Sequence, residues 1–197
     1  IGERAIRTDE LRGSYLDGPF RLSVRTAAPR AGVAMALQLE GAGSAAGPPL
    51  ARVIGLPEGI HMSGAADWRL AGRIERPAAR GRAWPVHFDV SSNLAGLGID
   101  APRPFAKRPA DLRDTRVALD VPGPGRNDLR IESGAARAAL EFTRRPDQRW
   151  VIERGAARFD GRPLARPARP GLHVAGDWPE FDLAEWLALR AATPGGP

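Results

Sequence analysis

Apolar and polar residues alternate with a period of two along most of the chain, which is typical of β-strands with one buried and one wet face. The alternation is clearest in short segments, each of which is predicted to be a strand. These segments are residues 20–25, 33–40, 68–74, 84–90, 117–121, 128–132, 140–142, 150–154 and 172–174. Their number predicts an all-β protein.

Turn-rich links separate the predicted strands. Glycine, proline and charged residues cluster at residues 32, 41–47, 57–59, 76–82, 122–125, 144–148 and 161–171. Links of this kind join consecutive antiparallel strands. The chain is therefore predicted to form an antiparallel meander.

Helical signals are confined to two places. Residues 49–54 are one candidate. Near the end of the chain, Asp182 is placed to cap a helix, and Glu185 follows three residues later, as in a capping box. We therefore predict a short C-terminal helix from Leu183 to about Arg190.

Residues 94–113 interrupt the alternation between two predicted strands. They contain several prolines, yet they are too apolar for a free linker. We expect this segment to fold over an edge or an opening of the sheet. The tail, residues 193–197, is rich in proline and glycine and is expected to be frayed.

The apolar face of so large a sheet must be covered. A second sheet, closure into a barrel or a bound ligand would each cover it. If the sheet closes on itself, a plain sandwich or barrel explains the pattern. If it stays curved and open, it presents a long apolar groove, which marks a binding site for apolar material. Alternation alone does not choose between them, because a sealed core and a groove produce the same pattern.

Charge does not point to a particular partner. The formal net charge is +6, which would ordinarily raise nucleic acid or an anionic membrane as partners. Acidic residues are interspersed among the basic ones along the chain, even in the densest basic stretch, residues 144–169. We therefore expect a solvated, arginine-rich surface and no nucleic-acid partner.

No motif for catalysis or metal binding is found. The chain has no cysteine, which excludes disulfides and thiolate chemistry. His61, His87 and His173 fall at polar positions of different segments, without metal-ligand spacing. The glycine-rich run 41–46 matches a relaxed dinucleotide fingerprint, but the prolines after it interrupt the helix that this motif needs, so we interpret the run as a loop. We predict a protein that is not an enzyme and has no cofactor or metal.

Several separated motifs resemble the C-terminal region of the YhdP family of AsmA-like envelope proteins. They are the runs at residues 150–161 and 170–187, Leu-Pro at 56–57 with Ser-Gly-Ala-Ala-Asp-Trp at 63–68, and Ser-Asn-Leu-Ala-Gly-Leu at 92–97 with Ala-Pro-Arg-Pro at 101–104 and Lys107. The resemblance covers about residues 55–190 well and the first 50 residues loosely. Ala101 and Asp160 depart from it, standing where the family usually has leucine and often has glycine.

The resemblance implies a large protein of Gram-negative bacteria with a long periplasmic β-groove. An N-terminal helix outside this chain would anchor that protein in the inner membrane. Family members are thought to move phospholipid toward the outer membrane. Residues 1–192 would then be one β-groove segment near the C-terminal end of such a groove.

With this resemblance, we predict a curved antiparallel meander sheet that forms an open apolar groove, with a short C-terminal helix. Phospholipid acyl chains would lie along the apolar face while headgroups stay in water, so no general base, metal or nucleotide is needed. The residues predicted to line the groove are Leu22, Val24, Leu37, Leu39, Trp68, Leu70, Val86, Phe88, Val117, Leu119, Ile131, Leu140 and Ile152. The alternative is a non-enzymatic envelope β-sandwich that binds protein or glycan through its polar, arginine-rich face.

Overall fold

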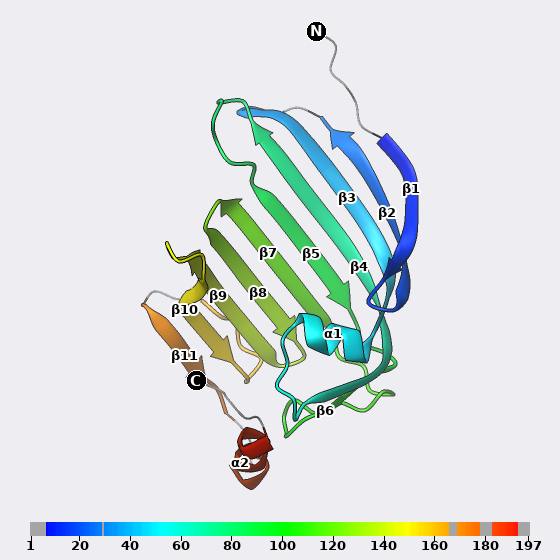
Figure 1. Cartoon of the computed structure of the whole chain (residues 1–197), viewed down its shortest axis with the longest axis vertical. Coiled ribbons are helices and arrows are strands. Elements are labelled where there is room, and N and C mark those ends of the chain that lie inside the picture. The colour runs from blue at the N-terminus through cyan, green and yellow to red at the C-terminus, as the bar shows by residue number, and fades with distance from the viewer. Residues whose placement is uncertain (1–6, 29, 166–168, 178–182, 193–197) are drawn as a thin grey trace.

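The computed structural model describes residues 7–28, 30–165, 169–177 and 183–192. These residues form one 11-stranded sheet and two short helices (Figure 1). The strands are β1 (Arg7–Tyr15), β2 (Gly18–Ala27), β3 (Val33–Ala46), β4 (His61–Pro77), β5 (Val86–Ser92), β6 (Leu97–Asp100), β7 (Thr115–Gly123), β8 (Arg126–Ser133), β9 (Ala136–Arg144), β10 (Trp150–Arg158) and β11 (Gly171–Ala175). The helices are α1 (Gly47–Val53) and α2 (Leu183–Ala192).

The strand order confirms the predicted meander. It runs β1-β2-β3-β4-β5-β7-β8-β9-β10-β11, with β1 and β11 at its two ends, so the sheet is open rather than closed into a barrel. Neighbours along this path are antiparallel, with the exception of β11, which pairs parallel to β10. A parallel pair needs a crossover connection, and residues 159–170 separate β10 from β11 in the sequence.

Most strands extend beyond their predicted bounds, and β3 and β4 extend furthest at one end. β3 continues to Ala46, so the glycine-rich run 41–46 is a strand and its interpretation as a loop is wrong. β4 begins at His61 rather than at residue 68, because it pairs with β3 as far as Ala65 and with β6 before that. Alternation failed here because small residues, rather than bulky apolar ones, fill both strands at this end.

One strand at the edge of the sheet was not predicted at all. β1 is mostly polar, and its apolar side chains are sparse, with Leu11 and Tyr15 both about half exposed. It pairs with β2 and has a register shift between Thr8 and Leu11. A polar, irregular edge strand lacks the period-two signal, which explains the omission.

Both predicted helices are present. α1 covers most of the candidate at residues 49–54 and contacts β3 and β4 at one end of the sheet. α2 confirms the predicted C-terminal helix, with Glu185 in its first turn. The proposed cap Asp182 and the tail 193–197 lie outside the described residues.

The irregular segment 94–113 folds against a free strand edge, as expected. It contains the unpredicted strand β6, which pairs with the first residues of β4, beyond the point where β5 pairs with β4. Leu97 of β6 is fully buried. Lys107 is buried as well, and its Nζ donates hydrogen bonds to the backbone oxygens of Leu97, at 2.7 Å, and Arg108, at 3.1 Å. A satisfied lysine therefore fixes the segment in place.

An aromatic cluster joins this segment to the C-terminal part of the chain. The Phe105 ring meets Phe159, just after β10, edge-on at 5.6 Å between centroids, and Trp186 of α2 at 5.7 Å. Such edge-on contacts are the favoured geometry for aromatic pairs. The cluster therefore links three segments that are distant in sequence at the lower end of the sheet (Figure 1).

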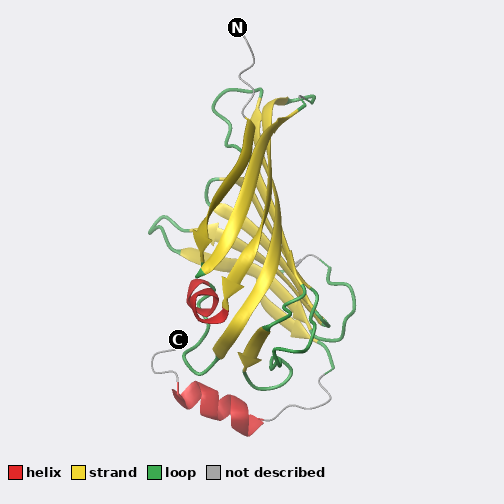
Figure 2. Cartoon of the chain, turned by 90° about the vertical axis from the view of Figure 1, so that its right-hand side faces the viewer, coloured by secondary structure: helices red, strands yellow, loops and turns green. Residues whose placement is uncertain are grey.

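Few side chains in this fold are fully buried. The buried apolar residues of the described chain are Ala36, Ala45, Ala66 and Leu97. Seen from the side, the described strands form a single twisted layer with both helices near one end (Figure 2). The described residues therefore do not form the β-sandwich of the alternative prediction, since no second sheet packs on the first.

Candidate functional site

Strand register places apolar side chains in continuous rows across the sheet. Residues directly opposite each other on neighbouring strands point to the same side. One row, from β2 to β11, is Val24, Leu39, Gly72, Phe88, Leu119, Leu129, Leu140, Gly155 and Leu172. A second row is Leu22, Gly41, Leu70, Val90, Val117, Ile131, Ala138, Ala157 and Val174. We call the side that carries these rows the apolar face.

Every residue predicted to line a groove is on the apolar face. Most of them belong to the two rows above. The others lie on the same side because they pair with residues of this face. Leu37 and Val86 both pair with Ile74, Ile152 pairs with Phe142, and Trp68 pairs with Gly43. The structure thus brings the predicted set together on one surface, while contact with lipid stays a prediction.

Other members of the apolar face were not among the predicted lining residues. They include Leu11, Phe20, Met35, Ile74, Val90, Val121, Leu129, Phe142, Trp150, Leu172 and Val174. Most of these stand in phase within predicted strands, so the same alternation could have identified them. Leu11 is different, because its polar strand gave no signal.

Glycines on the apolar face make room for large side chains from neighbouring strands. A Cβ atom at Gly72 would lie 2.9 Å from the Phe88 ring, and one at Gly155 would lie 2.8 Å from Leu172 and 2.9 Å from Leu140. These distances are too short for any real side chain. The large side chains therefore lie across the glycine positions, which flattens the apolar face.

The apolar face remains open to solvent in the described part of the chain. None of the predicted lining residues is fully buried, and Ile152 is 45% exposed. On β11, Leu172 and Val174 are 57% and 62% exposed. Contiguous exposed apolar surface is typical of interaction sites, so the apolar face is the candidate binding surface.

Hydroxyl groups bound the apolar face where β5, β7 and β8 meet the lower end of the sheet. Ser92 pairs with Thr115, which pairs with Ser133. The Thr115 and Ser133 hydroxyls are 2.8 Å apart, and the Ser92 hydroxyl donates to the backbone oxygen of Asp67 at 2.7 Å. The surface changes here from hydrocarbon to polar groups within one residue pair.

The opposite side of the sheet, which we call the polar face, carries cross-strand ion pairs. Arg116 donates to both carboxylate oxygens of Asp89 and thereby holds the pKa of Asp89 below its usual value. Asp120 accepts hydrogen bonds from Arg130 at 2.7 Å and lies 2.6 Å from the His87 ring. The prediction of a charged, solvated face is confirmed for this side of the sheet.

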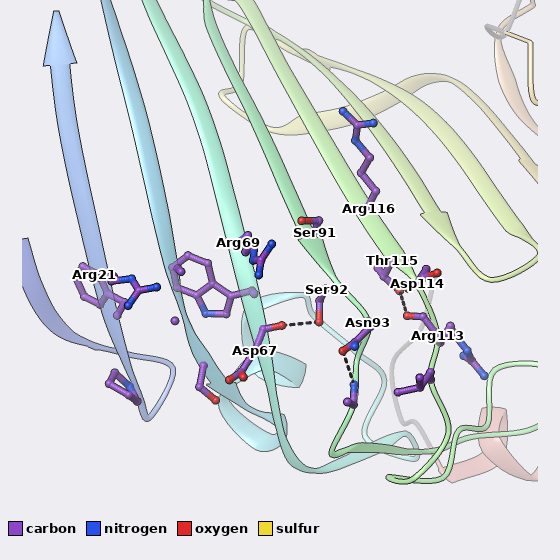
Figure 3. Close-up of a pocket in the computed structure, with 18 of the residues that line it drawn as sticks. Arg21, Asp67, Arg69, Ser91, Ser92, Asn93, Arg113, Asp114, Thr115 and Arg116 are labelled. Carbon is purple, nitrogen blue, oxygen red and sulfur yellow. Dashed lines mark hydrogen bonds between the residues drawn. The ribbon is translucent and has the colours of Figure 1, made fainter.

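A hollow of about 1650 Å³ lies at the lower end of the molecule, and it is lined mainly by polar residues. Figure 3 shows Arg21, Arg69, Ser91 and Arg116 along it, with Asn93 toward the sheet end. The apolar face, by contrast, is a broad open surface rather than an enclosed cavity. The two surfaces therefore suit ligands of different chemistry.

Features of other function classes are not found among the described residues. No group of three or more histidine, cysteine, aspartate or glutamate side chains is placed to hold a metal ion there. His61, His87 and His173 lie on β4, β5 and β11. No helix in the described part of the chain is long and apolar enough to cross a membrane.

Comparison with known proteins supports the sequence resemblance. The family described as YhdP protein matches residues 1–195, nearly the whole chain. No curated protein and no solved structure matches the chain significantly. The chain therefore belongs to the YhdP family and is an envelope protein of the AsmA-like group.

Proposed function

We propose that this chain is a segment of a lipid-transfer protein that conducts phospholipid acyl chains along its apolar face toward the outer membrane. The observation that supports this most is the open apolar face, which runs without interruption from β2 to β11. Membership of the YhdP family supports a location in the cell envelope. The full protein would be periplasmic and anchored to the inner membrane by a helix outside this chain.

The energetics favour holding an acyl chain while letting it slide. Each methylene that leaves water contributes about 0.8 kcal/mol, so a chain of ordinary length is retained firmly. Hydrocarbon contacts are not directional. Because the rows of the apolar face continue from strand to strand, a chain that moves across one strand exchanges one apolar contact for another of similar free energy.

The same geometry separates the acyl chain from the headgroup. A charged headgroup is costly to remove from water. The two apolar rows that begin at Val24 and Leu22 carry no charged residue. The hydroxyl row of Ser92, Thr115 and Ser133, by contrast, offers hydrogen-bonding groups at the boundary. Conduction of this kind is passive and needs no catalytic group, metal or nucleotide.

The test is lipid retention by two matched aspartate variants of β7. Leu119 lies on the apolar face, and its neighbour Ala118 lies on the polar face, so Leu119→Asp and Ala118→Asp add the same charge to opposite sides of one strand. The protein is purified without detergent, and bound lipid is measured by native mass spectrometry and by extraction. Circular dichroism checks that each variant is folded.

We expect phospholipid to purify with the wild-type protein and with Ala118→Asp. The amount bound to Leu119→Asp should be at least about tenfold lower, because covering a charge with an acyl chain is costly. Equal retention by the two folded variants would contradict the proposal. A folded wild-type protein that carries no phospholipid and takes none up from vesicles would also contradict it.

A further inference from the structure

Folding gathers arginines that the sequence leaves dispersed into one line across the polar face. The line follows direct strand pairs through Arg12, Arg21, Ala42, Arg69, Ser91, Arg116, Glu132, Arg137 and Arg158, from β1 to β10. We call it the arginine row. Strand pairing aligns these arginines although they lie far apart in sequence, and Glu132 stands among them in the same row.

The spacing within the central part of the arginine row is regular. Arg21, Arg69 and Arg116 stand on alternate strands, and the small residues Ala42 and Ser91 occupy the strands between them. Since neighbouring strands are about 4.8 Å apart, these arginines repeat at roughly 10 Å. The polar hollow lies over this stretch, because Arg21, Ala42, Arg69, Ser91 and Arg116 all line it (Figure 3).

Two of these arginines form no close ion pair among the described residues, although Arg21 is near enough to Glu10 to help lower the pKa of that carboxyl. Arg12 pairs with Glu10 and Arg116 pairs with Asp89. Arg21 and Arg69 form no ion pair within the part of the chain that the structure describes. Both residues pair directly with Ala42, one from each neighbouring strand, and their positive charge is available to an outside anion.

We propose that the arginine row binds an extended acidic peptide segment of a partner protein, in the polyproline II conformation, with carboxylates at every third residue. Such a peptide rises about 3.1 Å per residue and returns to the same side every three residues, so its carboxylates repeat at roughly 9.3 Å. This repeat fits the positions of Ala42 and Ser91, so one carboxylate would lie between Arg21 and Arg69, and the next would lie beside Arg69 and next to Arg116, which already binds Asp89. Guanidinium groups suit carboxylates because they donate paired hydrogen bonds.

The surroundings of the arginine row disfavour other anionic partners. Glu40 and Asp89 stand in the next row on one side, and Asp67 stands on the other, so a planar anionic membrane would meet carboxylates as well as arginines. Single-stranded nucleic acids commonly stack on aromatic side chains. No position in the arginine row is aromatic, and Phe20 and Trp68, which also line the hollow, belong by strand register to the apolar face. A narrow, linear ligand fits a single line of charge better than either.

The test measures fluorescence anisotropy of a labelled peptide with the repeat Pro-Pro-Glu, and of a second peptide with the same composition but with its glutamates in one block. The variant is Arg21→Gln with Arg69→Gln. The matched control is Arg80→Gln with Arg82→Gln, which removes the same charge from an exposed loop outside the row. Both double variants retain the whole apolar face, so the peptide-binding result is independent of the lipid proposal.

We expect the repeat peptide to bind the wild-type protein and the control, and to lose about tenfold in affinity with the Arg21/Arg69 variant, as for removal of interfacial charge pairs. The block peptide should bind more weakly than the repeat peptide. An equal loss with both double variants, equal binding of both peptides, or no binding to the wild-type protein would each overturn the proposal. Tighter binding to anionic vesicles than to the repeat peptide would assign the row to a membrane surface instead.

Discussion

At the scale of single residues, Asp160 shows how local charge is stabilised at the end of β10. Its carboxylate accepts hydrogen bonds from the Arg158 guanidinium and from the backbone nitrogen of Arg162. The hydrogen bond from Arg158 is the main reason that the pKa of Asp160 falls to about 2, from an ordinary 3.8. The ionised carboxylate therefore helps to hold the turn that begins the crossover to β11.

This depressed pKa predicts a specific pH dependence. Because the folded-state pKa lies below the unfolded value, the stabilisation from Asp160 is present above about pH 4 and is lost as pH falls toward about 2. We expect the melting temperature of the wild-type protein to exceed that of Asp160→Asn at neutral pH, and the two to converge across this window. Thermal unfolding followed by circular dichroism from pH 2 to pH 6 measures this, and a constant difference over the window would contradict it.

The residues of the candidate site were largely predictable from alternation. Alternation with a period of two predicts the side of the sheet on which each strand residue lies. Strand pairing then places Leu22, Phe88 and Leu119 on one surface, as predicted. The arginine row was not predictable, because it depends on the register between strands. Arg21 and Arg69 are distant in sequence and come together through their pairing with Ala42.

At the scale of secondary structure elements, prediction succeeded where bulky apolar residues alternate and failed where packing is unusual. β1 is polar and the far end of β3 is built from small residues, so neither carries the pattern. β6 is only four residues long and lies within a proline-broken segment. The parallel pairing of β11 depends on the path of the crossover, which local sequence does not determine.

The glycines of the apolar face give a prediction about packing between strands. A side chain at Gly72 would collide with Phe88 on β5, whereas one at the adjacent Ala71 points to the polar face and is exposed. We expect Gly72→Val to lower the free energy of unfolding by about 1–3 kcal/mol, the usual cost of overpacking, and Ala71→Val to change it by less than about 0.5 kcal/mol. Urea unfolding measures both, and equal changes would show that Phe88 does not depend on the space at Gly72.

At the scale of the whole molecule, the sheet is a single open layer with chemically different sides. The apolar face carries hydrocarbon from β2 to β11, and the polar face carries ion pairs and the arginine row. Alternation alone did not distinguish a sealed core from an open groove, because both show the same pattern, and the family resemblance favoured the groove. The structure distinguishes them through exposure, since Leu97 is the one large side chain that is fully buried among the described residues.

This two-sided architecture fits a protein that is bound on both sides in its envelope setting. Lipid on the apolar face and a peptide on the polar face would not compete, because the sheet lies between them. The aromatic cluster of Phe105, Phe159 and Trp186 and the buried Lys107 hold the lower end together without occupying either face. The sheet can therefore present both surfaces at once.

The most direct test of the central claim asks which face touches the acyl chain. Because the chain has no cysteine, single cysteines at Phe88 and at His87 can each carry one bimane fluorophore, on opposite faces of β5. Phospholipid with a nitroxide on its acyl chain is then added from vesicles, and bimane quenching is measured. We predict strong quenching for Phe88→Cys and little for His87→Cys, whereas equal quenching at both positions, or none at Phe88→Cys, would contradict conduction along the apolar face.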